Sequence, residues 1–176
     1  MKTSTRKILF ILIIIVVLGI SFGCSPKEQP TIANPENDMK EISIMPTDKI
    51  STEGLALLDY YNFDIDGDGI EETISMYVDA EQDPNGKILL DDGQKWLFLV
   101  ENKDKDYVLF DDFVQLGTIK FYVYNILDED AFYITTVKST TANLTITEYR
   151  FDKKTKSFIS KVVYNTTGNV NMLHSS

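Results

Sequence analysis

The sequence predicts an all-β domain, an antiparallel meander of about seven or eight strands. From about Leu55 onward, apolar residues recur with a period of two, and β-branched and aromatic residues dominate. Such alternation is typical of half-buried strands. Short segments rich in Asp, Asn and Gly separate the runs, and short connections between successive strands favour antiparallel pairing.

The predicted strands follow one another from residue 70 to residue 164. In the first, one side of the strand carries Ile70, Glu72, Ile74, Met76 and Val78, because side chains alternate along a strand. The later runs are 96–101, 107–110, 118–124, 132–138, 144–151 and 158–164. Residues 54–60 fit either one helical turn or the first strand.

A faint internal repeat with an offset of about 60 residues divides the strands into two halves. Residues 63–70 have a counterpart in residues 124–132, and an alternating strand follows each. Each half would supply about four strands, the content of one propeller blade, whereas a closed ring needs at least about four blades. We therefore expect propeller-blade-like units in an open or stacked arrangement, not a closed propeller. Chance similarity between regular hairpins explains the repeat equally well.

The first 23 residues have the composition of an export signal. Lys2, Arg6 and Lys7 form a basic start, and an apolar run follows at residues 8–20. The run is shorter than the roughly 20 apolar residues that span a bilayer. We expect a cleavable signal peptide at 1–23, and an uncleaved membrane anchor is the alternative.

Residues 21–24, Ser-Phe-Gly-Cys, place a small residue directly before the one cysteine of the chain, Cys24. This segment resembles the lipobox of bacterial lipoproteins, although Ser21 stands where the family usually has Leu. The resemblance implies that Cys24 carries acyl chains such as palmitate and that the protein is anchored on the extracytoplasmic face of the cell membrane. Two or more chains on one residue anchor a protein stably. A cytosolic protein with an ordinary buried cysteine is the remaining alternative.

The expected layout is a signal peptide at 1–23, a lipidated cysteine and proline-rich tether at 24–50, a β-domain at 51–165 and a flexible tail at 166–176. The tether contains four of the five prolines, Pro26, Pro30, Pro35 and Pro46. Proline favours an extended, semi-rigid spacer. An edge strand formed by Ile42, Ile44 and Ile50 is the alternative for the end of this segment.

Residues 64–72 have the spacing of a metal-binding loop. Carboxylates stand at loop positions 1, 3, 5 and 9, from Asp64, Asp66, Asp68 and Glu72. Gly69 permits a sharp bend that turns the carbonyl of Ile70 inward, and Ca²⁺ takes about six to eight oxygen ligands. Carboxylates so close together repel one another, and a cation relieves the repulsion. A solvated Asp-Gly turn is the alternative.

The same residues resemble the D-x-D-G-D-G-x-x-[DE] calcium loop of FG-GAP/VCBS-type repeats, which joins two β-strands in integrin-like propellers and in many bacterial surface proteins. The resemblance implies a Ca²⁺ site whose ligands are the side chains of Asp64, Asp66, Asp68 and Glu72 and the carbonyl of Ile70. A helix–loop–helix EF-hand is excluded because Ser75 stands where that motif requires Glu. Ile126 and Ala131 replace the first Asp and the essential Gly in the second half, so we expect no second site.

Composition excludes several classes of function. The chain has 27 acidic and 17 basic side chains, a net charge of −10, one His and one Cys. It therefore lacks the basic face that nucleic acids require, and it lacks the ligands for a multi-histidine or thiolate metal site. Removal of residues 1–23, with their three basic side chains and no acidic ones, leaves a net charge of −13.

Two functions from different classes remain. We favour a non-catalytic cell-surface lipoprotein whose calcium-stabilised β-domain contacts an envelope protein or glycan. The alternative is a glycan-binding or hydrolytic lipoprotein that uses acidic turns and strand aromatics. Its candidate residues are Asp91, Asp92, Asp111, Asp112, Asp128, Glu129 and Asp130, with Trp96, Phe98, Tyr122 and Tyr124. Carboxylates in turns are usually solvated and strand aromatics are usually core, so we do not expect an enzyme.

Overall fold

The computed structural model describes residues 40–129 and 131–166. These residues belong to one compact unit, Asn37–Ser176. The described part of the chain forms eleven strands and no helix, and each strand pair is antiparallel. The all-β, antiparallel prediction is confirmed. The predicted signal peptide, Cys24 and the tail from residue 167 lie outside the described residues.

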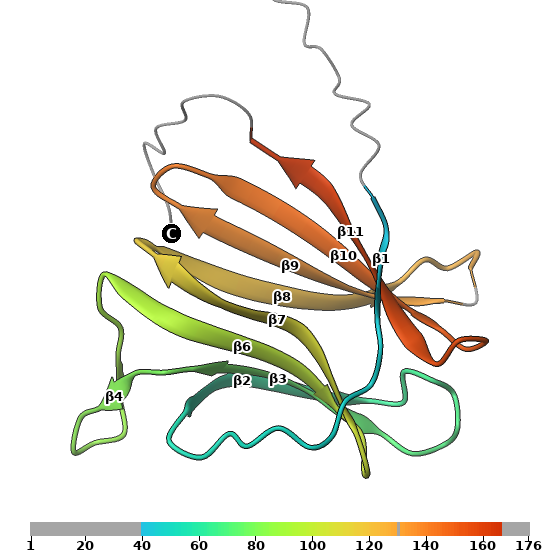
Figure 1. The fold of residues 1–176 in the computed structure, drawn as a ribbon, viewed down its shortest axis with the longest axis horizontal. Helices are drawn as coiled ribbons and strands as arrows, with labels where there is room; N and C mark the ends of the chain where they lie inside the picture. The colour runs from blue at the N-terminus through green and yellow to red at the C-terminus, as the bar shows by residue number, and fades with distance from the viewer. Residues whose placement is uncertain (1–39, 130, 167–176) are drawn as a thin grey trace, which may run out of the picture. The chain divides into compact units, whose positions relative to one another are not determined.

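Two sheets contain nine of the strands (Figure 1). The five-stranded sheet has the order β1 (Ile42–Ile44), β11 (Ser157–Asn165), β10 (Leu144–Asp152), β9 (Phe132–Thr140) and β8 (Gly117–Asn125). The four-stranded sheet has the order β2 (Ala56–Phe63), β3 (Glu72–Val78), β6 (Gly93–Glu101) and β7 (Asp106–Gln115). A separate small hairpin pairs β4 (Glu81–Gln82) with β5 (Ile88–Leu89).

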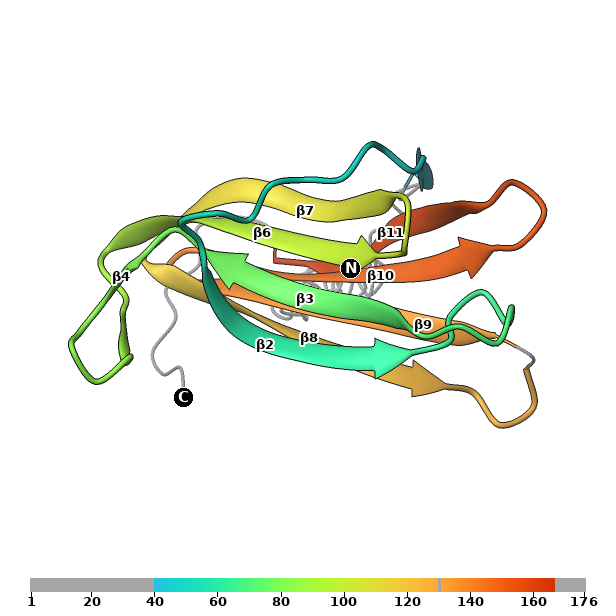
Figure 2. The ribbon, with the colours of Figure 1, turned by 90° about the horizontal axis from the view of Figure 1, so that it is seen from below.

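The two sheets stack as an open sandwich, as Figures 1 and 2 show. Strands β2, β3, β6 and β7 form the first meander, and β8 to β11 form the second. Neighbouring strands in each meander are also consecutive in the chain, apart from the β4–β5 hairpin. The expected stacked arrangement of two four-stranded units is therefore present, and the two sheets do not join into a closed barrel.

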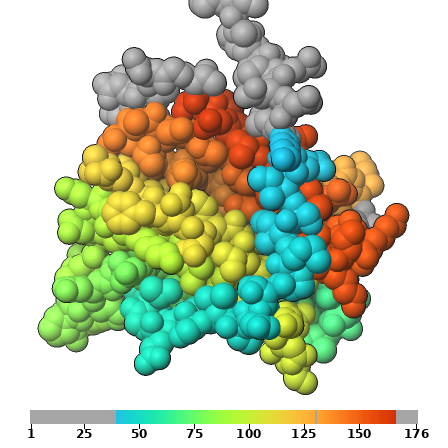
Figure 3. Space-filling view, viewed as in Figure 1, coloured from blue at the N-terminus to red at the C-terminus, as the bar shows by residue number. Residues whose placement is uncertain are grey.

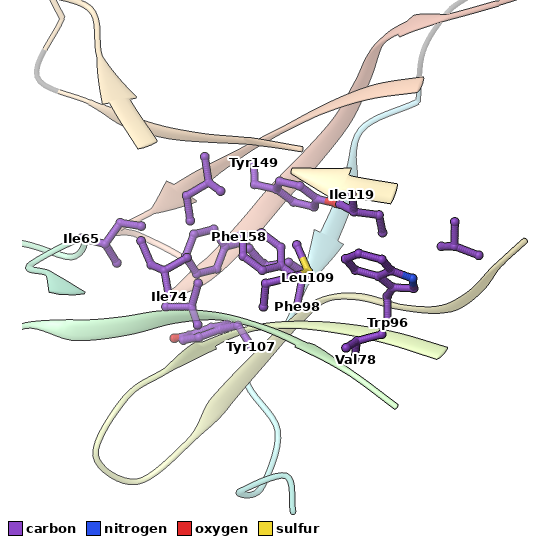
Figure 4. Close-up of a cluster of buried hydrophobic side chains, with 14 of the residues drawn as sticks. Ile65, Ile74, Val78, Trp96, Phe98, Tyr107, Leu109, Ile119, Tyr149 and Phe158 are labelled. Carbon is purple, nitrogen blue, oxygen red and sulfur yellow. The ribbon is translucent and has the colours of Figure 1, made fainter. Parts of the chain in front are cut away.

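The core lies between the sheets, and aromatic side chains from both meet there (Figure 4). The ring of Phe98 on β6 lies 5.0 Å from that of Phe121 on β8. The ring of Tyr107 on β7 lies 5.1 Å from that of Phe158 on β11. Tilted rings at such distances add about 0.5–1.5 kcal/mol per pair beyond the burial of their surface. These contacts hold the two sheets together.

The period-two alternation predicted for β3 is confirmed in the core. Ile74, Met76 and Val78 are at most 1% exposed, because their side chains point toward the other sheet. Glu72 begins the strand on the same face and is also buried, with 2% of its surface exposed. Ile70 precedes the strand and is exposed instead.

The folded domain begins earlier than residue 51, which corrects the predicted boundary between tether and domain. Residues 42–44 pair with β11 as an edge strand, so the alternative interpretation holds for Ile42 and Ile44. The backbone N–H of Thr47 donates to the carbonyl of Asp106 at 2.8 Å. Pro46 is compatible with this pairing because it falls between the strand and the bridge. Residues 54–60, left open by the sequence, belong mostly to β2.

A strap, residues 45–55, connects β1 to β2 and covers the outer face of the four-stranded sheet (Figures 1 and 3). Leu97 and Leu99 alternate with core residues on β6, yet they are only 6% and 0% exposed. The side chain of Asp106 is fully buried and holds the strap. One of its carboxylate oxygens contacts Lys49 Nζ at 2.5 Å, and the other accepts from Ile50 N at 2.7 Å.

Across the described segments, no helix has the length and apolar character required to span a bilayer.

Candidate metal centre

The acidic loop connects β2 to β3 at one end of the sandwich (Figure 2). Asp64 organises it by accepting backbone hydrogen bonds. Its Oδ1 accepts from Gly67 N at 2.7 Å and from Asp68 N at 3.1 Å, and its Oδ2 accepts from Gly69 N at 3.0 Å. Gly67 and Gly69 have φ angles of 78° and 89°, a left-handed conformation that glycine adopts without steric cost. The Asp-Gly alternation therefore encodes the tight winding of the loop.

Three of the four predicted carboxylates converge in this loop. Asp64, Asp66 and Glu72 each place one oxygen within 4.8 Å of the others. Asp68 lies outside this group, and its Oδ1 accepts from Ile70 N at 2.8 Å. The carbonyl of Ile70 remains a predicted ligand. A donor set made only of carboxylate oxygens suits a hard cation such as Ca²⁺ or Mg²⁺.

Glu72 is the buried member of this carboxylate cluster. Its Oε2 accepts from Ile65 N at 2.9 Å, and its Oε1 accepts from the side-chain amide of Asn102 at 3.1 Å. Burial raises the pKa of Glu72 above its ordinary value, and the neighbouring charges of Asp66, Asp68 and Asp64 raise it further. Because the charged form is disfavoured in the folded state, ionisation of Glu72 destabilises the fold as pH rises through that raised pKa. A bound cation would offset this effect.

Two neighbours of the loop were not found by sequence reasoning. Asn102 follows β6, and the pairing of Thr73 with Glu101 places it opposite Glu72. Lys153 lies in the turn between β10 and β11, on the other sheet. A methyl group added to Gly67 would lie 2.8 Å from Lys153 Nζ. Neither residue carries a local sequence signal, because both contacts depend on long-range packing.

The aromatic side chains of the alternative glycan function are divided between two environments. Trp96 and Phe98 are 2% and 0% exposed and belong to the core. Tyr122 and Tyr124 are 54% and 39% exposed, and Tyr124 stacks on Tyr133 with 5.5 Å between ring centroids. The four predicted aromatics therefore do not form one stacking platform.

The acidic turns of that alternative are also separate from one another. Asp91 and Asp92 are exposed in the segment that leads into β6. Asp111 and Asp112 lie within β7, where Asp111 pairs with Lys95 at 2.9 Å. Asp128 and Glu129 follow β8, and Asp130 lies outside the described residues. Within the described ranges, these carboxylates do not join a cluster of three or more metal-ligating side chains.

No protein-family model matches the chain, and the searches of curated proteins and of solved structures also found no match.

Proposed function

We propose that the protein is a non-catalytic, lipid-anchored cell-surface protein whose β-domain is stabilised by Ca²⁺ and contacts an envelope protein or glycan. The observation that carries the calcium part is the convergence of Asp64, Asp66 and Glu72. The lipid anchor rests on the lipobox-like residues that end at Cys24.

Ca²⁺ fits this loop better than Mg²⁺ does. Ca²⁺ accepts irregular shells of about six to eight oxygens, whereas Mg²⁺ demands near-octahedral geometry and keeps several waters. Asp64, Asp66 and Glu72 would supply three carboxylates, and Asp68 and the Ile70 carbonyl would complete the protein ligands after a small rearrangement. The left-handed glycines leave room for such movement because they carry no side chain.

The expected role of the ion is structural. Glu72 belongs to β3, accepts from Ile65 in the loop, and accepts from Asn102 beyond β6. A cation held by Glu72 and by Asp64 and Asp66 would therefore fix the loop to the four-stranded sheet. It would also neutralise the carboxylate repulsion that disfavours the folded state.

Calcium is expected to raise the melting temperature of the protein. At a free concentration of about 100 times Kd, binding adds about 2.7 kcal/mol to the free energy of unfolding, which corresponds to roughly 10 °C for a domain of this size. Asp66→Asn removes one ligand charge and should weaken calcium binding about 30-fold, the equivalent of about 2 kcal/mol. Titration calorimetry and thermal scans with calcium or a chelator measure both effects.

Asp92→Asn is the matched control for Asp66→Asn, since it removes one exposed aspartate charge away from the acidic loop. This variant should keep the calcium affinity and the calcium-dependent melting temperature of the unaltered protein. Equal melting temperatures in calcium and chelator for the unaltered protein would rule out the calcium proposal.

The anchor is expected to depend on Cys24. Cys24→Ala should abolish incorporation of a labelled fatty acid and release the protein from the membrane fraction, since the acyl chains supply the membrane affinity. Fractionation of cells that express either form measures the change. Retention of label in the Cys24→Ala variant would contradict lipidation at this residue.

A further inference from the structure

Two buried hydrogen-bond donors on β6 have no partner among the described residues. They are Gln94 Nε2 and Trp96 Nε1, and the two residues are only 6% and 2% exposed. Because they stand two positions apart, both side chains lie on the core face of the strand. An unsatisfied buried donor costs about 1–3 kcal/mol, and native proteins contain few of them. An acceptor from outside the described residues, a water or a ligand oxygen, would satisfy these two donors.

Trp96 forms part of the wall of a cavity of about 440 Å³. The cavity opens on the flank where the sandwich is not closed, because β2 and β8 are the edge strands of their sheets and lie on the same side of the molecule (Figure 2). The other apolar wall residues are Leu58, Met76, Ile119 and Phe121. This volume lies within the range of about 300–1,000 Å³ that is typical of small-molecule sites.

The indole nitrogen of Trp96 does not face the packed centre of the core. Figure 4 shows the indole nitrogen on the edge of the ring that is turned away from Phe98 and Leu109. The packed centre of the core therefore does not supply its acceptor. Gln94 lines a neighbouring cavity of about 370 Å³ beside the β4–β5 hairpin, so each of the two residues lines a cavity.

The charges around the cavity argue for a neutral ligand. Asp59 and Lys120 are exposed at its rim, and their opposite charges cancel locally. The net charge of −10 for the whole chain opposes entry of an anion. A pure hydrocarbon would leave the indole N–H without an acceptor, so the ligand must also carry an oxygen.

We propose that this cavity binds a small neutral molecule with an apolar ring and a carbonyl oxygen, which accepts a hydrogen bond from Trp96 Nε1. The ring would contact Met76, Ile119 and Phe121, and the carbonyl would satisfy the donor. This site is separate from the acidic loop, and its ligand class is independent of calcium.

A pair of probes of the same shape, 1-indanone and indane, tests the proposal. They share a bicyclic skeleton, and only 1-indanone has a carbonyl oxygen. Trp96 is the one tryptophan of the chain, so its indole N–H gives one indole resonance in a ¹H–¹⁵N spectrum of the labelled protein. We expect 1-indanone to shift this resonance downfield in a saturable manner and to bind about tenfold more tightly than indane.

Trp96→Phe is the matched variant, since it keeps an apolar ring in the wall and removes the donor. Ligand-observed NMR should show that the affinity for 1-indanone falls about tenfold, to that for indane, while indane binding is retained. If the variant does not fold, the difference in affinity between 1-indanone and indane on the unaltered protein still tests the proposal. An indole resonance that 1-indanone leaves unmoved, or equal affinities for the two probes on the unaltered protein, would overturn the proposal.

Discussion

Asp106→Ala is expected to lower the free energy of unfolding by about 4 kcal/mol, the cost of breaking a buried charged contact and leaving its partners unsatisfied. The carboxylate of Asp106 is fully buried and binds both Lys49 and the backbone N–H of Ile50. Without it, the strap keeps only the backbone hydrogen bonds between Thr47 and residue 106 as its attachment to β7, and water reaches Leu97 and Leu99 on the outer face of the sheet. Urea unfolding followed by circular dichroism measures the loss.

Asp111→Ala is the control for Asp106→Ala because it removes a carboxylate from the same strand. Asp111 pairs with Lys95, and both side chains are about half exposed, at 41% and 56%. Exposed ion pairs contribute only about 0–1 kcal/mol. Asp106→Asn should fall between the two, since its amide oxygen still accepts from Ile50 while the charge beside Lys49 is lost. A loss for Asp106→Ala no larger than that for Asp111→Ala would show that the strap does not depend on this carboxylate.

Glu72→Gln is expected to have opposite effects with and without calcium. In chelator at pH 7, the substitution removes a buried charge beside Asp64, Asp66 and Asp68, so stability should be unchanged or higher. The oxygen of the introduced amide still accepts from Ile65, and its NH₂ group can donate to the Asn102 oxygen once that side chain flips. In calcium, the variant loses a charged ligand and should be about 2 kcal/mol less stable than the unaltered protein.

The same substitution should also change the pH dependence in chelator. The pKa of Glu72 is raised above its ordinary value of 4.5 in the folded state. Its contribution to stability is therefore fully present below about 4.5 and is lost as pH rises through the raised pKa. Across this pH window, the melting temperature of the unaltered protein should fall as pH rises. The fall should be smaller in Glu72→Gln. Glu71→Gln, at the exposed neighbouring position, is the control and should retain both the pH dependence of the melting temperature and the stabilisation by calcium. If Glu72→Gln destabilised the protein equally in calcium and in chelator, Glu72 would not be a metal ligand.

The strands could be predicted from the sequence because their alternation has a local cause. Each core-facing residue of β3 and β6 is separated from the next by one residue of the opposite face. One exception is β7, where the predicted strand ends at Phe110 although the strand continues to Gln115. Asp111 and Asp112 resemble a turn in the sequence, but here they occupy exposed positions of a strand, and Asp111 pairs with Lys95 on the adjacent strand.

The ends of the predicted domain were less accurate because they depend on distant partners. β1 has three residues, too few to show a period, and it pairs with β11, more than 110 positions later in the chain. The acidic loop illustrates the same distinction. Spacing was sufficient to place Asp64, Asp66 and Glu72 together, whereas the contact of Glu72 with Asn102 follows from the register between β3 and β6.

The segment made of β1 and the strap also has a mechanical consequence. β1 pairs with the five-stranded sheet and the strap binds the four-stranded sheet, so a pulling force that enters through residue 40 acts on the five-stranded sheet first and on the four-stranded sheet second. The contacts would fail in chain order: β1 would peel from β11 before the load reached Thr47 and then Lys49. The apolar outer face beneath the strap is therefore uncovered only after β1 has separated from β11. The contacts of Asp106 with Lys49 and Ile50 resist further unfolding from this end.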